Sequence, residues 1–106
     1  MEDIKETICI NTKPKYISKV GVNTNPIKLA TSIQLSLMGG KDVELLSMGK
    51  DACYNVSKAI CISQGFAIVN GLELRWRPSY KTVYGDVDGQ PRSVMSWLVW
   101  IDTIAS

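Results

Sequence analysis

The residues of this chain that could do chemistry are mostly cations. Between Thr7 and Lys41 the sequence contains five lysines and no aspartate or glutamate. Such a segment could neutralise the phosphates of a nucleic acid, or it could be an ordinary solvated surface. The formal net charge of +2 is too small to decide between these two interpretations. The decision therefore depends on which cations the fold brings together.

Catalytic and metal-binding chemistry find little support in the sequence. The chain has no histidine, the commonest general base and metal ligand. Its three cysteines form no C-x-x-C pair, and Cys53 and Cys61 lie about 12 Å apart on a predicted helix, too far for a disulfide. The segment Gly49-Lys50-Asp51 lacks the spacing of a phosphate-binding loop. We therefore expect no enzyme, no cofactor and no metal site.

Length and composition fit one globular domain. Of the 106 residues, 45% are hydrophobic and 21% are charged, which is ordinary for a globular protein with one modest core. No apolar run approaches the ~20 residues that a membrane helix needs. The chain begins with the acidic segment MEDIKET, which is not a secretion signal. We expect an intracellular protein, cytoplasmic or nuclear, with no membrane segment and with reduced thiols.

A strand, a turn and a helix between Val43 and Phe66 organise the predicted fold. Residues 43–48 are short and apolar, as in a buried strand, and Gly49 permits the turn. A helix follows, with Asp51 as its predicted cap and Gly65 as its predicted end, and Phe66 returns to the core. The predicted buried stripe of this helix comprises Ala52, Val56, Ala59, Ile60 and Ser63.

Strand-like segments at residues 7–10 and 16–22 precede this unit. They form either a hairpin or a flexible segment followed by the first strand of the domain, and we favour the second interpretation. Asn25 and Pro26 then predict a helix start, because Asn25 can cap the first amide hydrogens and Pro26 suits the first helical position. Gly39-Gly40 ends this helix. Its predicted apolar stripe comprises Leu29, Ala30, Ile33 and Leu37.

Two strands complete the chain. Residues 72–77 alternate between apolar and charged, which indicates a strand with one solvated face. Pro78 breaks the ladder or marks an edge strand, and Asp88-Gly89 predicts a hairpin turn before a final strand at residues 93–101. The predicted order is β-α-β-α-β-β. We expect the first two strands to be parallel, and the last two to form a projecting antiparallel hairpin.

Residues 26 to about 101 resemble the stage V sporulation protein S family of the Alba superfamily. The resemblance rests on NPIKLATSI, SMGKDACYNVSKAICISQGF, Asn70-Gly71, Pro78 and Asp88-Gly89 at fixed spacing. It implies an α/β fold in two layers, an α+β sandwich with a four-stranded mixed sheet and two helices on one face, usually as a homodimer. Residues 16–103 would form this domain, and residues 1–15 would be an N-terminal extension.

The resemblance also implies binding of RNA or DNA through the phosphate backbone, with little sequence specificity. In Alba relatives the surface is formed by the loop after the first strand, the start of the second helix and the final hairpin. Two differences from archaeal relatives stand out, because that loop has few lysines here and Asp86 and Asp88 oppose phosphate near the hairpin tip. The corresponding residues of this chain are Lys19, Asn23, Thr24, Asn25, Lys28, Lys50, Arg75, Arg77, Lys81 and Arg92.

The alternative is a structural or interaction subunit of a larger protein assembly that uses the same fold without nucleic acid. The low net charge favours this alternative. Trp76, Trp97 and Trp100 all lie in apolar alternation, which predicts packing in a core or an interface rather than stacking on bases. Salt-sensitive binding to RNA or DNA would distinguish the two functions.

Overall fold

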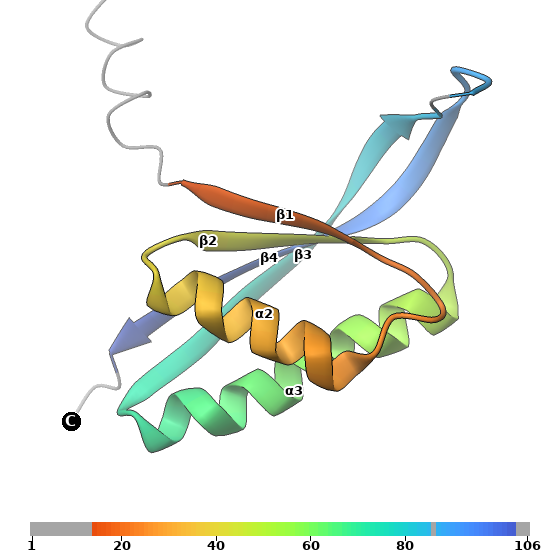
Figure 1. The fold of residues 1–106 in the computed structure, drawn as a ribbon. Coiled ribbons are helices and arrows are strands. Elements are labelled where there is room, and N and C mark those ends of the chain that lie inside the picture. Colours follow the sequence, from red (N-terminus) through yellow and green to blue (C-terminus); the bar gives the residue numbers. More distant parts are fainter. Residues whose placement is uncertain (1–13, 86, 104–106) are drawn as a thin grey trace, which may run out of the picture.

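The computed structural model describes residues 14–85 and 87–103 of the chain. The predicted strand at residues 7–10 and most of the predicted N-terminal extension lie outside these described residues. The element order agrees with the sequence-based prediction (Figure 1). The elements are β1 (Lys15–Val20), α2 (Pro26–Met38), β2 (Asp42–Ser47), α3 (Lys50–Val69), β3 (Leu72–Tyr84) and β4 (Pro91–Thr103).

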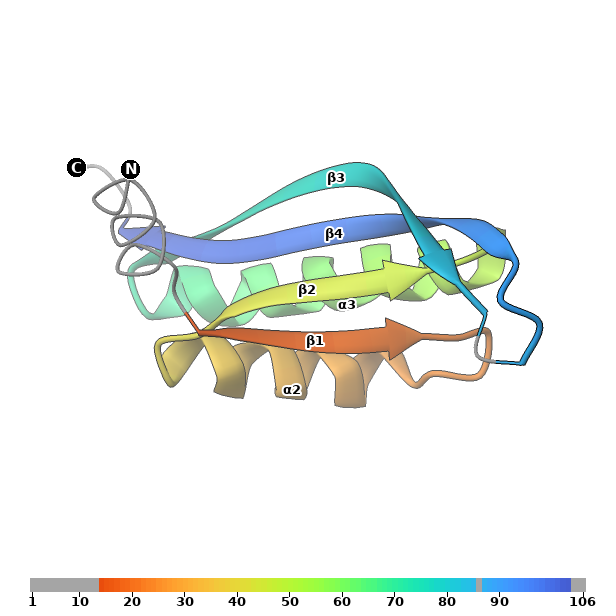
Figure 2. The same cartoon turned by 90° about the horizontal axis from the view of Figure 1, so that it is seen from above.

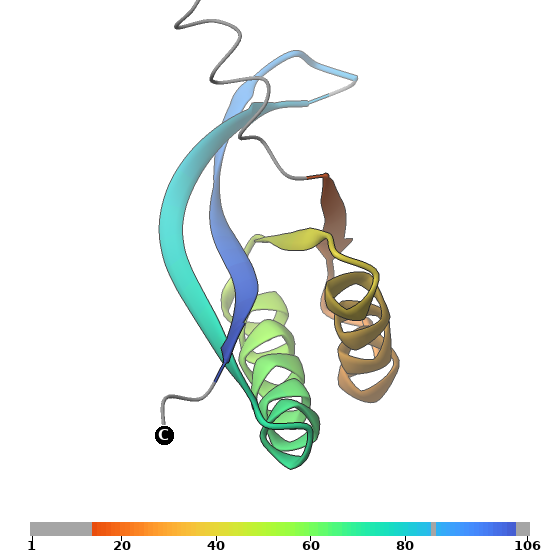
Figure 3. The same cartoon turned by 90° about the vertical axis from the view of Figure 1, so that its left-hand side faces the viewer.

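The four strands form one mixed sheet in the order β1-β2-β4-β3, and both helices cover the same face of it (Figure 3). β1 pairs with β2 in parallel, as expected, because α2 supplies the crossover between them. β4 is antiparallel to both of its neighbours, β2 and β3. β3 is therefore an edge strand, which explains how it accommodates Pro78 without losing a central hydrogen bond.

The hydrophobic core lies between the sheet and the two helices. Val43, Leu45 and Val99 project from the two central strands and are fully buried, in contact with the apolar stripes of the helices. Both predicted stripes are confirmed. In α2 the buried residues are Leu29, Ala30, Ile33 and Leu37, and in α3 they are Ala52, Asn55, Val56, Ala59, Ile60, Ser63 and Ala67.

Trp97 belongs to this core, as the packing interpretation predicted. Its side chain is buried, and its indole Nε1–H donates a hydrogen bond of 2.8 Å to Ser47 Oγ. The ring of Trp76 lies against it, with 5.9 Å between the ring centroids. Ser47 Oγ also lies 3.2 Å from the sulfur of Cys53, which is a free thiol. A buried indole has no face left for a base, so Trp97 has a structural role.

Two predictions about α3 are wrong at its ends. The helix begins at Lys50, after Gly49, whose φ of 87° suits glycine, and Asp51 makes no capping hydrogen bond. The helix also continues past Gly65 to Val69, which leaves Phe66 half-exposed rather than in the core. A glycine inside a helix costs only about 1 kcal/mol, and burial of Ala67 two residues later offsets this cost.

The β3–β4 hairpin extends well beyond the other strands. β3 and β4 pair from Leu72–Thr103 to Tyr84–Pro91, whereas β2 reaches only as far as Met95 on β4. The far half of the hairpin therefore has no neighbouring strand, and it curves over the uncovered face of the sheet (Figures 2 and 3). Asp88 stabilises the turn by accepting a hydrogen bond of 3.0 Å from the Gln90 amide. The predicted projecting hairpin is thus present.

Candidate nucleic-acid interface

The face of the sheet opposite the helices carries most of the charge of the strands. We call it the open face. Side chains alternate along a strand, so Tyr16, Ser18 and Val20 of β1 point toward the core while Lys15 and Lys19 point away from it. The same alternation in β2, β3 and β4 places Glu44, Arg75, Arg77, Lys81 and Ser96 on the open face.

The buried carboxylate of Glu44 is the centre of an ionic cluster on this face. Its side chain is only 6% exposed, although it carries a carboxylate. The Ser96 hydroxyl donates to Glu44 Oε2 at 2.6 Å, Lys81 Nζ donates to the same oxygen at 3.2 Å, and Lys15 Nζ donates to Oε1 at 3.2 Å. The cluster joins all four strands, because its members come one from each.

These contacts lower the pKa of Glu44 below its ordinary value. The hydrogen bond from Ser96 has the largest effect, since it stabilises the ionised carboxylate. Burial raises the pKa, and the two lysines lower it again. Sequence reasoning missed this residue. The signal was available, because a glutamate in the middle of an apolar strand needs partners for its charge.

Several of the predicted phosphate-binding cations have acidic partners within the fold. In the described part of the chain, no ion pair involves Lys19, Lys28, Lys50 or Arg77. The others are partly neutralised by a neighbour, which reduces the charge they offer to a ligand. The pairs are Lys81–Glu44 at 3.2 Å, Arg92–Asp88 at 2.7 Å, Arg75–Glu73 at 3.2 Å and Arg75–Asp102 at 2.9 Å.

One end of the molecule brings together cations from distant parts of the sequence. The end of β1, the loop after it, the start of α3 and the hairpin tip all lie at the right-hand end in Figure 2. There Lys19 and Arg92 line a single hollow of about 410 Å³, which we call the terminal hollow. Its lining residues are Lys19, Val20, Leu46, Met48, Val83, Tyr84, Gly85 and Arg92.

The loop between β1 and α2 is fixed at the same end by its own side chains. Asn25 Oδ1 accepts from the amides of Ile27 and Lys28 at 2.9 and 3.3 Å, which confirms the predicted cap. Thr24 Oγ1 accepts from the Gly21 amide at 2.8 Å. Those oxygens already have partners, and the cap occupies the amides that an anion at the start of α2 would need.

A side chain of α3 ties this loop to the second helix. Asn55 is buried, and its Nδ2 donates to the carbonyl oxygens of Gly21 and Val22 at 3.0 and 3.1 Å. These two hydrogen bonds hold the start of α2, where Lys28 lies, near the first turns of α3, where Lys50 lies. The two lysines therefore belong to the same end of the molecule as Lys19.

The remaining predicted cations lie farther along the open face. Arg77 and Lys81 line a second hollow of about 250 Å³ together with Lys15 and Glu44. Arg75 is set apart from both hollows, because it lies opposite Trp100 near the other end of β3. The structure thus unites Lys19 with Arg92, and Arg77 with Lys81, but it separates Arg75 from them.

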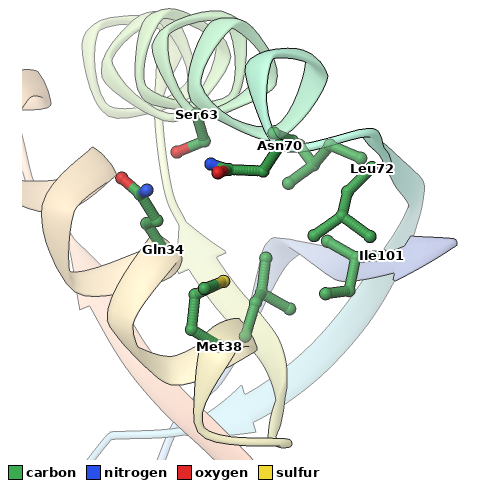
Figure 4. Close-up of a pocket in the computed structure, with 9 residues that line it drawn as sticks. Gln34, Met38, Ser63, Asn70, Leu72 and Ile101 are labelled. Atoms are coloured by element: carbon green, nitrogen blue, oxygen red, sulfur yellow. The ribbon is translucent and has the colours of Figure 1, made fainter. Parts of the chain in front are cut away.

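A further pocket lies between the helices at the opposite end of the molecule. Figure 4 shows Gln34 and Met38 of α2 directed toward Ser63 of α3 and toward Asn70, which follows α3, with Leu72 and Ile101 closing one side. Its volume is about 20 Å³, room for roughly one water molecule and too small for an organic ligand. It is a packing defect rather than a binding site.

Within residues 14–85 and 87–103, no group of three histidine, cysteine, aspartate or glutamate side chains could hold a metal ion. None of the helices described there has the length and apolar character needed to cross a membrane.

The comparison with protein families agrees with the family resemblance drawn from the sequence. The family model of stage V sporulation protein S (SpoVS) matches residues 16–102. Among solved structures, the chain is similar to Alba from Thermoplasma volcanium, with 16% sequence identity and a TM-score of 0.49. That alignment covers 81% of this chain and 98% of the other. No curated protein matches the sequence.

Proposed function

Because the chain belongs to the stage V sporulation protein S family, we propose that it is an intracellular nucleic-acid-binding protein that acts as a homodimer. It binds the phosphate backbone of RNA or DNA with little sequence specificity. The observation that supports this proposal is the terminal hollow, which is lined by Lys19 from β1 and Arg92 from β4. Lys28 and Lys50 lie in the first turns of the two helices, at the same end of the molecule.

The arrangement suits phosphate contacts better than base recognition. Each lysine that neutralises a phosphate releases condensed counterions, so affinity depends steeply on salt. In the neighbouring loop, the side-chain oxygens of Thr24 and Asn25 already accept hydrogen bonds from the backbone, which leaves them less available to bases. We therefore attribute binding to charge and shape.

The test is a fluorescence anisotropy titration with labelled RNA and DNA over a range of salt concentrations. Replacing Lys19, Lys28 and Lys50 together by glutamate should abolish measurable binding. The milder triple change to glutamine should make the slope of log affinity against log salt less steep by about 2 to 3, because each lost phosphate contact accounts for ~0.9 of that slope.

A matched control is available at the other end of α2. Lys41 is exposed and lies after the helix, away from the terminal hollow. Lys19→Gln should weaken binding more than Lys41→Gln, although both remove one positive charge. Unchanged binding by the triple variants, or equal losses for the two single variants, would refute this surface. Light scattering tests the homodimer, which a strict monomer at high micromolar concentration would contradict.

A second candidate function is supported by an exposed apolar surface. Trp76 is 49% exposed, and it lines a hollow of about 390 Å³ between α3 and the edge strand β3, together with Ile60, Cys61 and Leu74. Such a surface is typical of protein–protein contacts. The chain would then be an interaction subunit of a larger assembly. Purification with other proteins, without nucleic acid, would favour this function.

A further inference from the structure

The terminal hollow combines two kinds of lining that phosphate binding alone does not require. Lys19 and Arg92 contribute positive charge, whereas Leu46, Met48 and Tyr84 contribute apolar and aromatic surface. Tyr84 is 69% exposed and Met48 is 50% exposed, so both reach solvent rather than the core. A phosphate would use the charges and leave this apolar lining uncovered.

We propose that this hollow accepts an unpaired base, so that the protein binds single-stranded RNA or DNA through base stacking as well as phosphate contacts. This inference rests on the proposed function and names its substrate class. The hollow measures about 410 Å³, within the range of sites that hold small organic molecules. A base would lie against Tyr84 and Met48, and its own phosphate would lie near Lys19 and Arg92.

The ion pair at the hairpin tip is compatible with this arrangement. Asp88 holds one nitrogen of Arg92, Nη2, at 2.7 Å. An arginine side chain has five N–H donors, so the remaining donors stay available for a phosphate oxygen while the pair fixes the guanidinium. The pair also holds the guanidinium close to the turn that forms the hairpin end of the hollow.

The preference for single strands over duplexes follows from the accessibility of the bases. In a duplex both faces of each base are stacked, and exposing one requires unpairing and unstacking. A single strand presents base faces freely, and every base has such a face, so this contact adds affinity without sequence specificity. The hollow is therefore expected to distinguish single-stranded from double-stranded nucleic acid, but not one base sequence from another.

The test compares three labelled oligonucleotides of equal length by fluorescence anisotropy. They are an intact single strand, a single strand with abasic sites that carries the same number of phosphates, and the intact strand annealed to its complement. RNA and DNA versions are measured separately. The intact strand should bind about 5- to 150-fold more tightly than the abasic strand, the range expected for stacking of one base.

Tyr84→Leu removes the aromatic ring while keeping an apolar side chain. It should lower affinity for the intact strand toward that for the abasic strand, and it should change neither duplex binding nor the salt slope, because no charge is removed. Tyr80→Leu is the matched control, since Tyr80 lies on the same strand, is 83% exposed and does not line this hollow. It should bind the intact strand like the unmodified protein.

The outcomes separate this inference from the proposed function. Equal affinity for intact and abasic strands, or equal losses for Tyr84→Leu and Tyr80→Leu, would overturn the base-accepting hollow. Salt-sensitive binding in the same experiment would still support phosphate binding. Absence of binding to all three oligonucleotides would overturn both. Circular dichroism of each variant confirms that the fold is intact.

Discussion

Replacement of Glu44 by glutamine tests how strongly the ionic cluster holds the sheet together. Glutamine keeps the size of the side chain, but it loses the charge that Lys15 and Lys81 face. Each of these lysine side chains is more than 40% exposed, so each pair contributes only about 0.2–1 kcal/mol. The hydrogen bond from Ser96 changes from a charged to a neutral acceptor, a loss of about 1 kcal/mol.

We therefore expect Glu44→Gln to lower the free energy of unfolding at pH 7 by about 1–3 kcal/mol. The larger losses of 3–5 kcal/mol seen when fully buried pairs are broken do not apply, because the lysines remain partly solvated. For a domain of this size the loss corresponds to a fall in Tm of roughly 10 °C. Urea denaturation monitored by circular dichroism measures it.

The dependence on pH follows from the lowered pKa of Glu44. Ser96 and the two lysines stabilise the ionised carboxylate in the folded state, so the folded pKa lies below the unfolded value of about 4.5. The stabilisation is therefore fully present above the unfolded pKa and is lost as the pH falls through the folded pKa. The difference in free energy of unfolding between wild type and Glu44→Gln should be constant from pH 6 to 8. It should shrink at pH 3, which lies below the unfolded pKa of the carboxyl group.

Two lysine variants provide the control for this experiment. Lys81→Met should destabilise the wild type, but it should have a much smaller effect in the Glu44→Gln background, because the partner charge is already absent. Lys19→Met, on the same face of β1 as Lys15, should have little effect on stability in either background, because no described residue pairs with it. A Glu44→Gln variant as stable as wild type at pH 7, or a difference that does not change with pH, would refute the reasoning.

Two further predictions concern the cap of α2 and the hairpin tip. Asn25→Ala should lower the free energy of unfolding by about 1 kcal/mol, because it removes the acceptor for two amide hydrogens. Asn25→Asp keeps a side-chain acceptor and should keep the stability of the wild type. Urea denaturation compares the variants, and equal stability of Asn25→Ala and wild type would contradict the assigned cap. Asp88→Asn should strengthen nucleic-acid binding several-fold and steepen the salt slope of binding by up to ~0.9, because it frees the charge of Arg92. The amide oxygen of the new asparagine can still accept from the Gln90 amide, so the turn is retained. Anisotropy titrations measure the change, and weaker binding would contradict it by showing that the pair with Asp88 orients Arg92 for binding.

The fold could be predicted from the sequence where the signals are local. Asn25 and Pro26 mark the start of α2 because the cap and the fixed φ of proline act within one turn. The apolar residues Leu29, Ile33 and Leu37 recur at helical spacing, so their burial follows from periodicity alone. Two of the strand pairings also follow, because α2 crosses between the parallel strands β1 and β2, and Asp88-Gly89 turns the hairpin of β3 and β4. The pairing of β2 with β4 follows from neither signal.

The end of α3 could not be predicted from the same kind of signal. Gly65 is a common helix terminator, but here Ala67 packs into the core and Gln64 accepts a hydrogen bond of 2.8 Å from the Leu74 amide. Both contacts belong to the tertiary structure, and they outweigh the modest propensity cost of a helical glycine. The residue that ends the helix is Asn70, followed by Gly71 with a φ of 74°.

The sequence predicted which cationic residues belong to the candidate site, but not which of them are neutralised by an acidic partner. Counting lysines and arginines gives no information on which of them face an acid across the sheet. Arg75 illustrates this, because its partner Asp102 lies on β4 and pairs in register with Glu73, the other partner of Arg75. Such pairs depend on strand register, which no local pattern in either segment reveals.

Register therefore sets the strength with which this surface can attract a polyanion. Lys19, Lys28, Lys50 and Arg77 have no ion-pair partner among the described residues, so they can contribute up to four phosphate contacts and a salt slope of about −3 to −4. Lys81 and Arg92 are partly neutralised by Glu44 and Asp88, so each adds less than a full phosphate contact to the slope while its ion pair persists. A slope near −3 would mean that the pairs persist in the complex, whereas a slope beyond about −4 would mean that nucleic acid displaces the internal carboxylates.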